Sequence, residues 1–315
     1  MTRGIPRIAL TGALLLALAF PTHAQGDTSS VRFDGVGFEF SHRLGRSVNI
    51  TQVPRQRPGS PGISEAAPAH VTFSLYPRLP ESRRPPRPIA VPGTIRVYAT
   101  SALEGYPTAS RQLARLQALL TERPDPASLG AIDDNQTVDL PYLPIDGAAQ
   151  AIAARIGFID TPELAGIAYV TGFRQDLFPF ARDDFWYTFQ GLSTDGQWYV
   201  AVSWVVRATM FPVRVRNADA RRIGRNATTW ERYIRQSVAT LDAAEASAFR
   251  PSLETLDALV RSIDFESVEA PSASPSVAPS PSAAASPDGV PASEGPTPSD
   301  VASPVASVPP SSTAP

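Results

Sequence analysis

The clearest alternation of apolar and polar positions lies in residues 183–204, which read DDFWYTFQGLSTDGQWYVAVSW. Two aromatic-rich runs flank Asp195-Gly196, and this predicts a β-hairpin with a type I′ turn, because both central residues of that turn need positive φ. A two-residue turn makes one face of the hairpin wholly apolar, whereas a shift by one residue scrambles the two faces. The predicted register pairs Phe185 with Val206, Tyr187 with Trp204 and Phe189 with Val202.

The opposite face of this hairpin mixes polar and apolar residues, and we expect it to meet a helix, solvent or a partner. The polar and aromatic groups near this face are suited to a shallow binding site. The alternative is that its aromatic residues belong to the core. The candidate ligand-binding or partner-binding residues are Arg174, Asp176, Trp186, Gln190 and Tyr199.

The same periodicity predicts elements in the first half of the chain. Alternating apolar residues predict strands within 36–41, 71–75 and 95–97. Leucines at helical spacing predict a helix that begins near Thr108 and stops before Pro124. From Ala148 the sequence predicts a short helical turn, a strand, a six-residue connection and a second strand.

The second half ends in helices. Residues 211–226 predict an Arg-rich connection, and the capping box Thr228-x-x-Glu231 predicts the start of a helix after it. A last helix is expected to begin near Ser252. Because strands are grouped ahead of these helices, we expect an α+β fold over residues 28–266, in which an antiparallel β-sheet carries helices packed on one side.

Both ends of the chain differ from this domain. Residues 1–24 combine Arg3 and Arg7 with an apolar run and a small-residue exit, which predicts a secretory signal peptide cleaved near Ala24. That run is shorter than the ~20 apolar residues of a membrane helix, so we expect a secreted or periplasmic protein with no transmembrane anchor in the mature chain. Residues 267–315 are rich in Pro, Ser and Ala, which predicts a disordered tail.

Composition excludes several kinds of chemistry. The chain has no cysteine, which excludes disulfides and thiolate sites, and its 28 basic residues are all arginine, which excludes a lysine base or Schiff base. Two of these arginines precede residue 25, and four of the 30 acidic residues follow residue 268, so the part between them carries no net formal charge. A broad nucleic-acid-binding surface is therefore not expected.

The remaining candidate chemistry is sparse. His42 and His70 stand alone in sequence, so we expect no metal site, and we expect no cofactor. Residues 133–139 resemble a calcium loop only loosely, because the central glycine and terminal glutamate are missing. Asp183 or Asp184, just before the hairpin, could form an acid/base pair with Asp176, as in glycoside hydrolysis.

Two strings of the sequence resemble a family of exported bacterial proteins with a YTFQGLT-x-DG-x-YYV hairpin motif. They are LPYLPIDGAAQ at 140–150 and FWYTFQGLSTDGQWYVAVSW at 185–204. The resemblance spans residues 31–212, and the chain departs from the family pattern at 181–184, where relatives often carry an asparagine pair. The family has no established activity, so the resemblance implies export and one integral domain rather than a reaction.

Two functions follow as expectations. The first is a non-catalytic envelope or extracellular binding module, whose partner the sequence does not identify. The alternative is a hydrolase that acts on cell-wall or extracellular polymer through carboxylates near Asp176 and Asp183.

Overall fold

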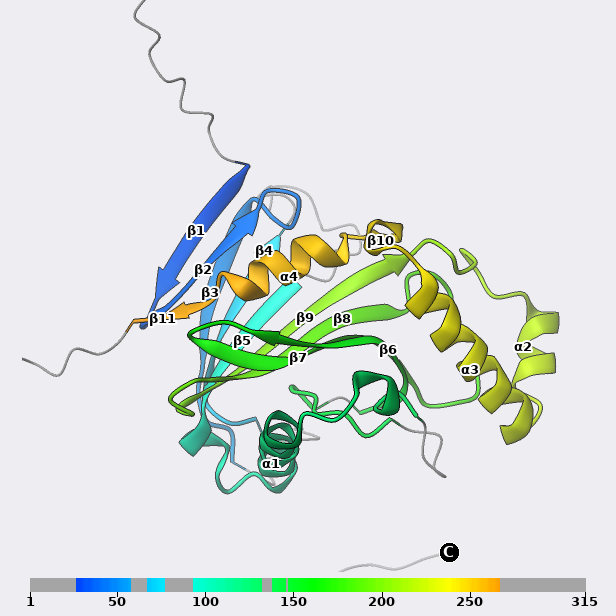
Figure 1. Cartoon of the computed structure of the whole chain (residues 1–315), viewed down its shortest axis with the longest axis horizontal. Helices are drawn as coiled ribbons and strands as arrows, with labels where there is room; N and C mark the ends of the chain where they lie inside the picture. The colour runs from blue at the N-terminus through cyan, green and yellow to red at the C-terminus, as the bar shows by residue number, and fades with distance from the viewer. Residues whose placement is uncertain (1–26, 58–66, 77–92, 132–137, 146, 267–315) are drawn as a thin grey trace, which may run out of the picture. The chain divides into compact units, whose positions relative to one another are not determined.

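The computed structural model describes residues 27–57, 67–76, 93–131, 138–145 and 147–266 (Figure 1). The predicted signal peptide and tail lie outside these residues, as does most of the loosely calcium-like segment. The described residues all fall in one compact unit, which ends at Val268. The α+β class and the antiparallel sheet are confirmed.

The main sheet is antiparallel and follows the order β3-β4-β5-β9-β8-β7-β6, with β10 paired to β9. The central hairpin β8–β9 is therefore covered on both edges by other strands. The strands are β3 (Ser47–Val53), β4 (His70–Tyr76), β5 (Gly93–Ala99), β6 (Ala149–Asp160), β7 (Leu164–Arg174), β8 (Phe185–Ser193), β9 (Trp198–Ala208) and β10 (Phe249–Arg250).

A second, three-stranded sheet brings the two ends of the described chain together. It has the order β1-β2-β11, with β1 (Thr28–Phe33), β2 (Val36–Ser41) and β11 (Asp264–Phe265), and both pairings are antiparallel. An Arg32 Nη2 to Asp264 Oδ1 bond of 2.6 Å joins β1 to β11, and the Phe265 ring stacks on Trp198 of the main sheet.

The helices pack on both faces of the main sheet, so the one-sided packing we expected holds for only part of them (Figure 1). One face carries α3 (Ala227–Ala243) and α4 (Leu253–Arg261), and α2 (Asn217–Ile223) lies against α3. The other face carries α1 (Pro107–Glu122). Within the described residues, none of these helices is long and apolar enough to cross a bilayer.

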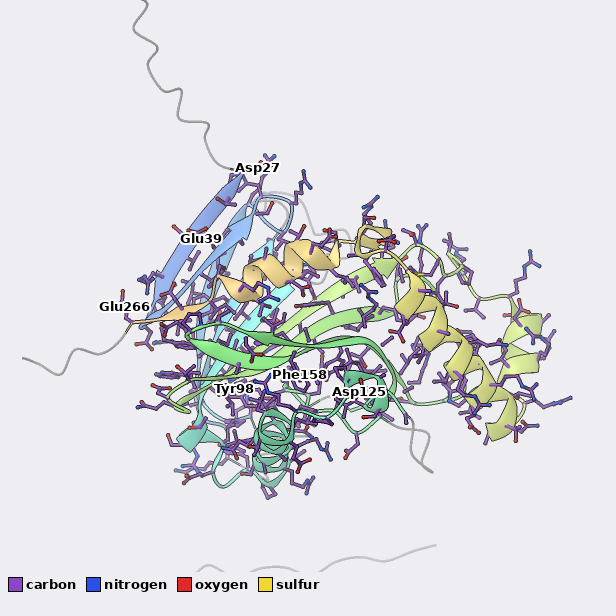
Figure 2. All side chains as sticks on the ribbon, viewed as in Figure 1. Asp27, Glu39, Tyr98, Asp125, Phe158 and Glu266 are labelled. Carbon is purple, nitrogen blue, oxygen red and sulfur yellow. The ribbon has the colours of Figure 1, made fainter. Side chains whose placement is uncertain are left out.

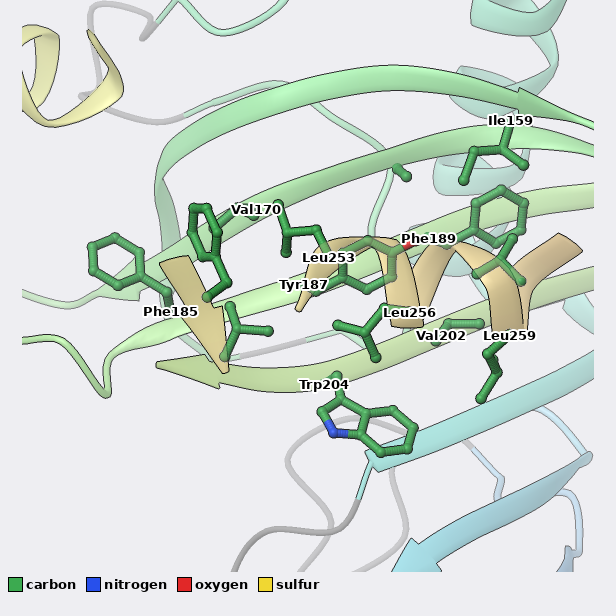
Figure 3. Packing of buried hydrophobic residues seen from close by; sticks show 14 of the residues in the cluster. Ile159, Val170, Phe185, Tyr187, Phe189, Val202, Trp204, Leu253, Leu256 and Leu259 are labelled. Atoms are coloured by element: carbon green, nitrogen blue, oxygen red, sulfur yellow. The ribbon is translucent and has the colours of Figure 1, made fainter. Parts of the chain in front are cut away.

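The larger core lies between the sheet and α3 and α4. Figure 3 shows Phe185, Tyr187 and Phe189 of β8 beside Leu253 and Leu256 of α4. The three β8 residues come from the wholly apolar face that the sequence predicts for the hairpin. Burying such large side chains contributes roughly 1.5–3 kcal/mol each, so this face is a principal source of the fold's stability.

The hairpin register is confirmed, but the predicted turn type is wrong. Strands β8 and β9 pair as Phe185↔Val206, Tyr187↔Trp204 and Phe189↔Val202. Among the described residues around the turn, only Gly196 has positive φ, 70°, so the turn is not type I′. Instead, Gly196 N donates to Ser193 O, and the Asp195 carboxylate accepts from Gln197 N and Ser193 Oγ.

Three further expectations need correction. The predicted helical turn at Ala148 is absent, because residues 149–160 form the long strand β6, whose pairing with β7 contains two register shifts. The cap of α3 is Asn226, whose side chain accepts from Thr229 N, rather than the predicted Thr228 box. The Arg-rich connection contains helix α2. The expected helices at α1 and α4 are confirmed, and Ser252 caps α4.

Candidate functional site

The mixed face of the hairpin is not an open surface. Tyr199 and Gln190 are both 0 % exposed, and Trp186 is half-buried. Helix α1 and residues 138–145 cover this face and form a second apolar core with Tyr199 and Tyr169. The shallow site expected here is therefore wrong in its geometry, because the sequence pattern does not reveal that a helix from the other half of the chain packs on these strands.

Gln190 holds the covering segment by its main chain. Its Oε1 accepts from Leu143 N at 2.9 Å and from the Tyr199 hydroxyl at 2.7 Å. Its Nε2 donates to Leu143 O at 3.3 Å and to Thr188 Oγ1 at 2.7 Å. All the hydrogen-bonding capacity of a buried amide is thus used inside the protein, so Gln190 is a positioning residue.

Tyr169 fixes the same segment two residues earlier. Its hydroxyl donates to Pro141 O at 2.6 Å and accepts from Gln150 Nε2 at 3.1 Å. Burial raises the pKa of Tyr169 well above its ordinary value, so it stays a neutral donor. The strings at 140–150 and 185–204 therefore contact each other directly, through Gln190 and Leu143.

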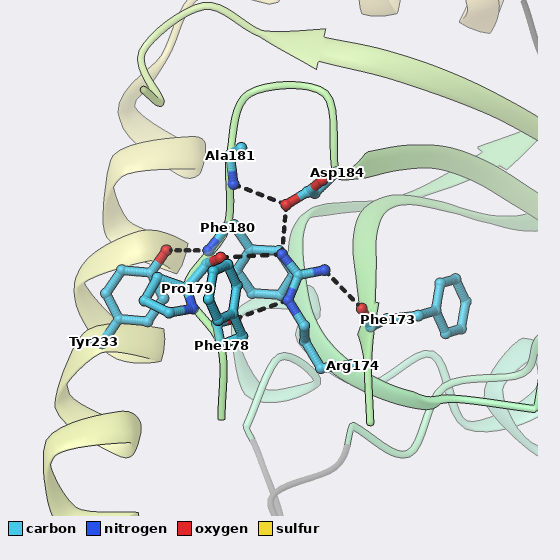
Figure 4. A network of polar contacts seen from close by, with 8 residues as sticks. All are labelled: Phe173, Arg174, Phe178, Pro179, Phe180, Ala181, Asp184 and Tyr233. Carbon is cyan, nitrogen blue, oxygen red and sulfur yellow. Dashed lines mark hydrogen bonds and ion pairs between the residues drawn. The ribbon is translucent and has the colours of Figure 1, made fainter. Parts of the chain in front are cut away.

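The guanidinium of Arg174 forms hydrogen bonds with several neighbouring groups (Figure 4). Its guanidinium donates to Phe178 O, Phe173 O and Pro179 O, and its Nη2 lies 2.5 Å from Asp184 Oδ2. It also lies 4.0 Å from the centre of the Phe180 ring. These hydrogen bonds use four of its five N–H donors, so Arg174 stabilises the 178–184 loop.

The two carboxylates just before the hairpin are each bound to an arginine. Asp184 accepts from Arg174 and Ala181 N, while Asp183 accepts from Arg207 Nε at 2.6 Å. The Arg207 hydrogen bond lowers the pKa of Asp183, which is the wrong direction for a general acid. Asp176 is exposed on the loop after β7. Among the described residues, no group of three or more His, Asp or Glu side chains is placed to hold a metal ion.

A pocket of about 250 Å³ opens on the α1 side of the sheet, between β4, β5, the start of α1 and residues 143–145. Tyr98, labelled in Figure 2, lies on this face of the sheet. Most of the pocket wall is apolar. The lining residues are Ala67, Pro68, His70, Arg96, Tyr98, Tyr106, Pro107, Thr108, Ala109, Leu143, Pro144 and Ile145.

Three polar side chains of the pocket lie close together on β4 and β5. The His70 and Tyr98 rings are 4.6 Å apart, and Arg96 Nη1 donates to Thr94 Oγ1 at 2.9 Å. His70 Nδ1 is 2.8 Å from Pro68 O. Burial, and to a smaller extent the Arg96 charge, lowers the pKa of His70, so this imidazole is neutral near pH 7.

Tyr98 is the most buried of the three polar groups, with 2 % of its surface exposed. Burial raises its pKa to about 12, although the Arg96 charge opposes this. Its hydroxyl has no hydrogen-bond partner among the described residues. Because Tyr98 lines the pocket, this hydroxyl can form a hydrogen bond with a group that enters it.

Sequence reasoning missed Arg96 and Tyr98. Arg96 alternates with Ile95 and Val97, and such a residue is ordinarily assigned to a solvent face. Of the polar groups in this pocket, the sequence analysis singles out only His70, and it stands alone in sequence. The strand pattern could not show that α1 and the Leu143 segment cover this part of the sheet.

A second, larger groove of about 730 Å³ lies beside the β8–β9 turn, lined by four acidic residues and the Trp198 and Phe265 rings. Two of its acids already have partners. Asp195 closes the turn, and Glu266 pairs with Arg32 at 3.3 Å. We therefore treat the smaller pocket as the candidate site.

The fold and the pocket together define an α+β protein with a small, largely apolar cavity that carries one cationic side chain. No family model, no curated protein and no solved structure matches this chain. The resemblance to the exported bacterial family therefore stays a prediction.

Proposed function

We propose that this chain is an exported, non-catalytic binding module of the cell envelope or extracellular space, and that the pocket beside Tyr98 binds a small ligand. The observation that carries the proposal is Arg96, a half-buried guanidinium that lines the apolar pocket and has no ion-pair partner among the described residues. Partly enclosed apolar pockets with a few convergent polar groups are the usual form of ligand sites.

The non-catalytic part of the proposal rests on how the polar groups are used. The acids near the hairpin are bound to arginines, and the described residues of the pocket wall include no carboxylate. His70 is neutral and has no neighbouring acid or nucleophile in the wall. A binding role needs only recognition, which this set of groups can supply.

Binding is tested by thermal shift of the purified full chain against a library of small metabolites. Ile145→Trp places a large ring at the pocket wall and should abolish the shifts that wild type shows. Val213→Trp, at an exposed position outside the pocket, is the matched control and should keep them. If Ile145→Trp and wild type respond alike to every ligand, the pocket is not the site.

Export is tested separately. The protein recovered from the periplasm or medium should begin near residue 25 by N-terminal sequencing, because the Arg3-to-Ala24 segment has signal-peptide character. Recovery of the uncleaved chain from the cytoplasm alone would contradict the exported part of the proposal and leave the pocket part standing.

A further inference from the structure

The charge of the pocket points to one sign of ligand. Among the lining residues that the structure describes, Arg96 is the only side chain that carries a charge, since His70 is neutral and none of them is Asp or Glu. Arg55 lies 5.7 Å from the centre of the ring of Tyr106, which is one of the lining residues. A cation in a small apolar enclosure attracts an anion more strongly than it does in water, because the local dielectric constant is low.

The first turn of helix α1 forms part of the same wall. The helix is 16 residues long, and its N-cap residue Tyr106 supplies no side-chain cap. The Tyr106 hydroxyl donates instead to Gln56 O at 2.7 Å. Thr108 and Ala109 belong to the first turn of α1 and line the pocket. The positive end of the helix dipole therefore lies beside the pocket.

Tyr98 is a second, independent observation that points to a ligand site. It lines the pocket, it is 2 % exposed, and its hydroxyl has no partner in the described part of the chain. The raised pKa keeps this hydroxyl protonated, so it is a donor. Arg96 also has donors to spare, since among the described residues only its Nη1 forms a hydrogen bond, to Thr94 Oγ1.

The rest of the wall limits the body of the ligand. Ala109, Leu143 and Ile145 supply apolar contact, and prolines complete the wall. A volume of about 250 Å³ is below the roughly 300–1,000 Å³ of sites for drug-sized molecules, so the pocket is suited to a small molecule.

We infer that the pocket binds a small organic monocarboxylate, with the carboxylate held by Arg96 and the Tyr98 hydroxyl and the apolar body against Leu143 and Ile145. A carboxylate matches the planar fork of an arginine and accepts from a neutral hydroxyl at the same time. This inference rests on the proposed binding function and specifies its ligand class.

The test compares matched probes by isothermal titration calorimetry on the full chain at neutral pH. The probes are benzoate and pentanoate, each with its neutral amide, and methyl phosphate as a second anion. In wild type, at least one carboxylate should bind about tenfold or more tightly than its amide, because an arginine contact to a charged oxygen contributes at least ~1.4 kcal/mol.

Variants assign the preference to residues. Arg96→Gln should remove the preference for carboxylate over amide, and Tyr98→Phe should weaken carboxylate binding about three- to tenfold without affecting the amide. Arg96→Lys keeps the charge but not the fork, and should fall between wild type and Arg96→Gln. Arg207→Gln, on the exposed ion pair with Asp183, is the control and should bind as wild type does.

The outcomes separate the inference from the proposed function. Equal binding of acid and amide, insensitive to Arg96→Gln, would overturn the carboxylate assignment while the pocket still binds ligands. Tighter binding of methyl phosphate than of either carboxylate would replace the carboxylate by a phosphate ester. If no probe binds and the metabolite library gives no shift that Ile145→Trp removes, both the inference and the binding function fail.

Discussion

Phe189 and its neighbours show how closely single residues of the hairpin are fitted. The ring is 0 % exposed and covers Gly191 on its own strand and Gly166 on β7. A Cβ built at Gly191 would lie 2.5 Å from the Phe189 ring, and one built at Gly166 would lie 2.4 Å from it. The glycine of the YTFQG string is therefore required by packing.

Gly191→Ala should destabilise the protein by about 1–3 kcal/mol, because the new methyl group forces the Phe189 ring out of its place. Urea unfolding measures this difference. Gly147→Ala is the control, since a Cβ there meets nothing within 4 Å, and it should leave stability within about 0.5 kcal/mol. Equal stability of the two variants would show that Phe189 can move at no cost.

Asp257 predicts a pH effect at the scale of one residue. Its Oδ1 accepts from the buried Tyr187 hydroxyl at 2.8 Å. Burial raises the pKa of Asp257, although Tyr187, Arg261 and Arg155 oppose the rise. The native state therefore binds this proton more tightly than the unfolded state does. Its contribution to stability is fully present below about pH 4 and is lost as pH rises through the raised pKa.

Asp257→Asn removes that titration and can keep the Tyr187 hydrogen bond. The unfolding free energy of wild type relative to Asp257→Asn should fall as pH rises from about 4 towards neutrality. Asp183 and the other acids act on both proteins alike, so the difference isolates residue 257. A difference that stays constant with pH would show that its carboxyl pKa is not raised.

At the scale of elements, the network around Arg174 determines how the loop 178–184 joins β7 to β8. Arg174→Ala should cost about 1.5–3 kcal/mol, because it removes charge-assisted hydrogen bonds from three carbonyls and Asp184. Arg174→Lys should rescue little, since an ammonium cannot match the planar fork. Thermal or urea unfolding of both variants measures these losses.

Arg207→Ala provides the matched comparison for Arg174. It breaks the ion pair with Asp183, whose side chains are 51 % and 49 % exposed. Such exposed pairs contribute at most about 1 kcal/mol, so this variant should be nearly as stable as wild type. If Arg207→Ala were as damaging as Arg174→Ala, burial would not be the reason for the importance of Arg174.

The elements differ in how well the sequence predicts them. The β8–β9 register follows from alternation alone, because one face must be wholly apolar. The turn type does not follow from alternation. Hydrogen bonds from Ser193 Oγ and Gln197 N to the Asp195 carboxylate stabilise a turn in which Asp195 does not have positive φ. The sequence predicts a helical turn at the start of β6 because this segment is rich in alanine. Pairing with β7 overrides the helix propensity of alanine.

At the scale of the whole molecule, the sequence could not predict the candidate site. Its wall combines Pro68, Arg96, the start of α1 and the segment at Leu143, which are distant in sequence. Periodicity reports which face of a strand is apolar, but not which distant element covers a mixed face. The alternation of residues 95–97 therefore assigns Arg96 to a solvent face, and nothing in the sequence distinguishes Tyr98.

Closure of the chain through β11 predicts a difference between two truncations. A chain that ends at Val268 should unfold at the same temperature as the full chain, because the Pro/Ser/Ala-rich tail has little apolar surface to bury. A chain that ends at Ile263 loses the pairing of Asp264 with Gly37 and the contact of Phe265 with Trp198. It should melt several degrees lower, by roughly 4 °C or more if about 2 kcal/mol is lost.

Differential scanning calorimetry of the two truncations distinguishes the roles of β11 and the tail. A lower transition for the chain ending at Val268 would contradict the prediction of a disordered tail. An unchanged transition for the chain ending at Ile263 would show that the three-stranded sheet holds without β11.

The hydrogen bonds of Gln190 to Leu143 hold the 138–145 segment without depending on the side chains that line the pocket. Both bonds go to main-chain atoms, N and O of residue 143, which every side chain leaves in place. Exchanges at Leu143 or Ile145 would therefore resize the cavity while the loop stays attached to β8. Such an arrangement lets one scaffold diversify its ligands through a few point mutations, with the anchor as the constant part and the wall as the variable part.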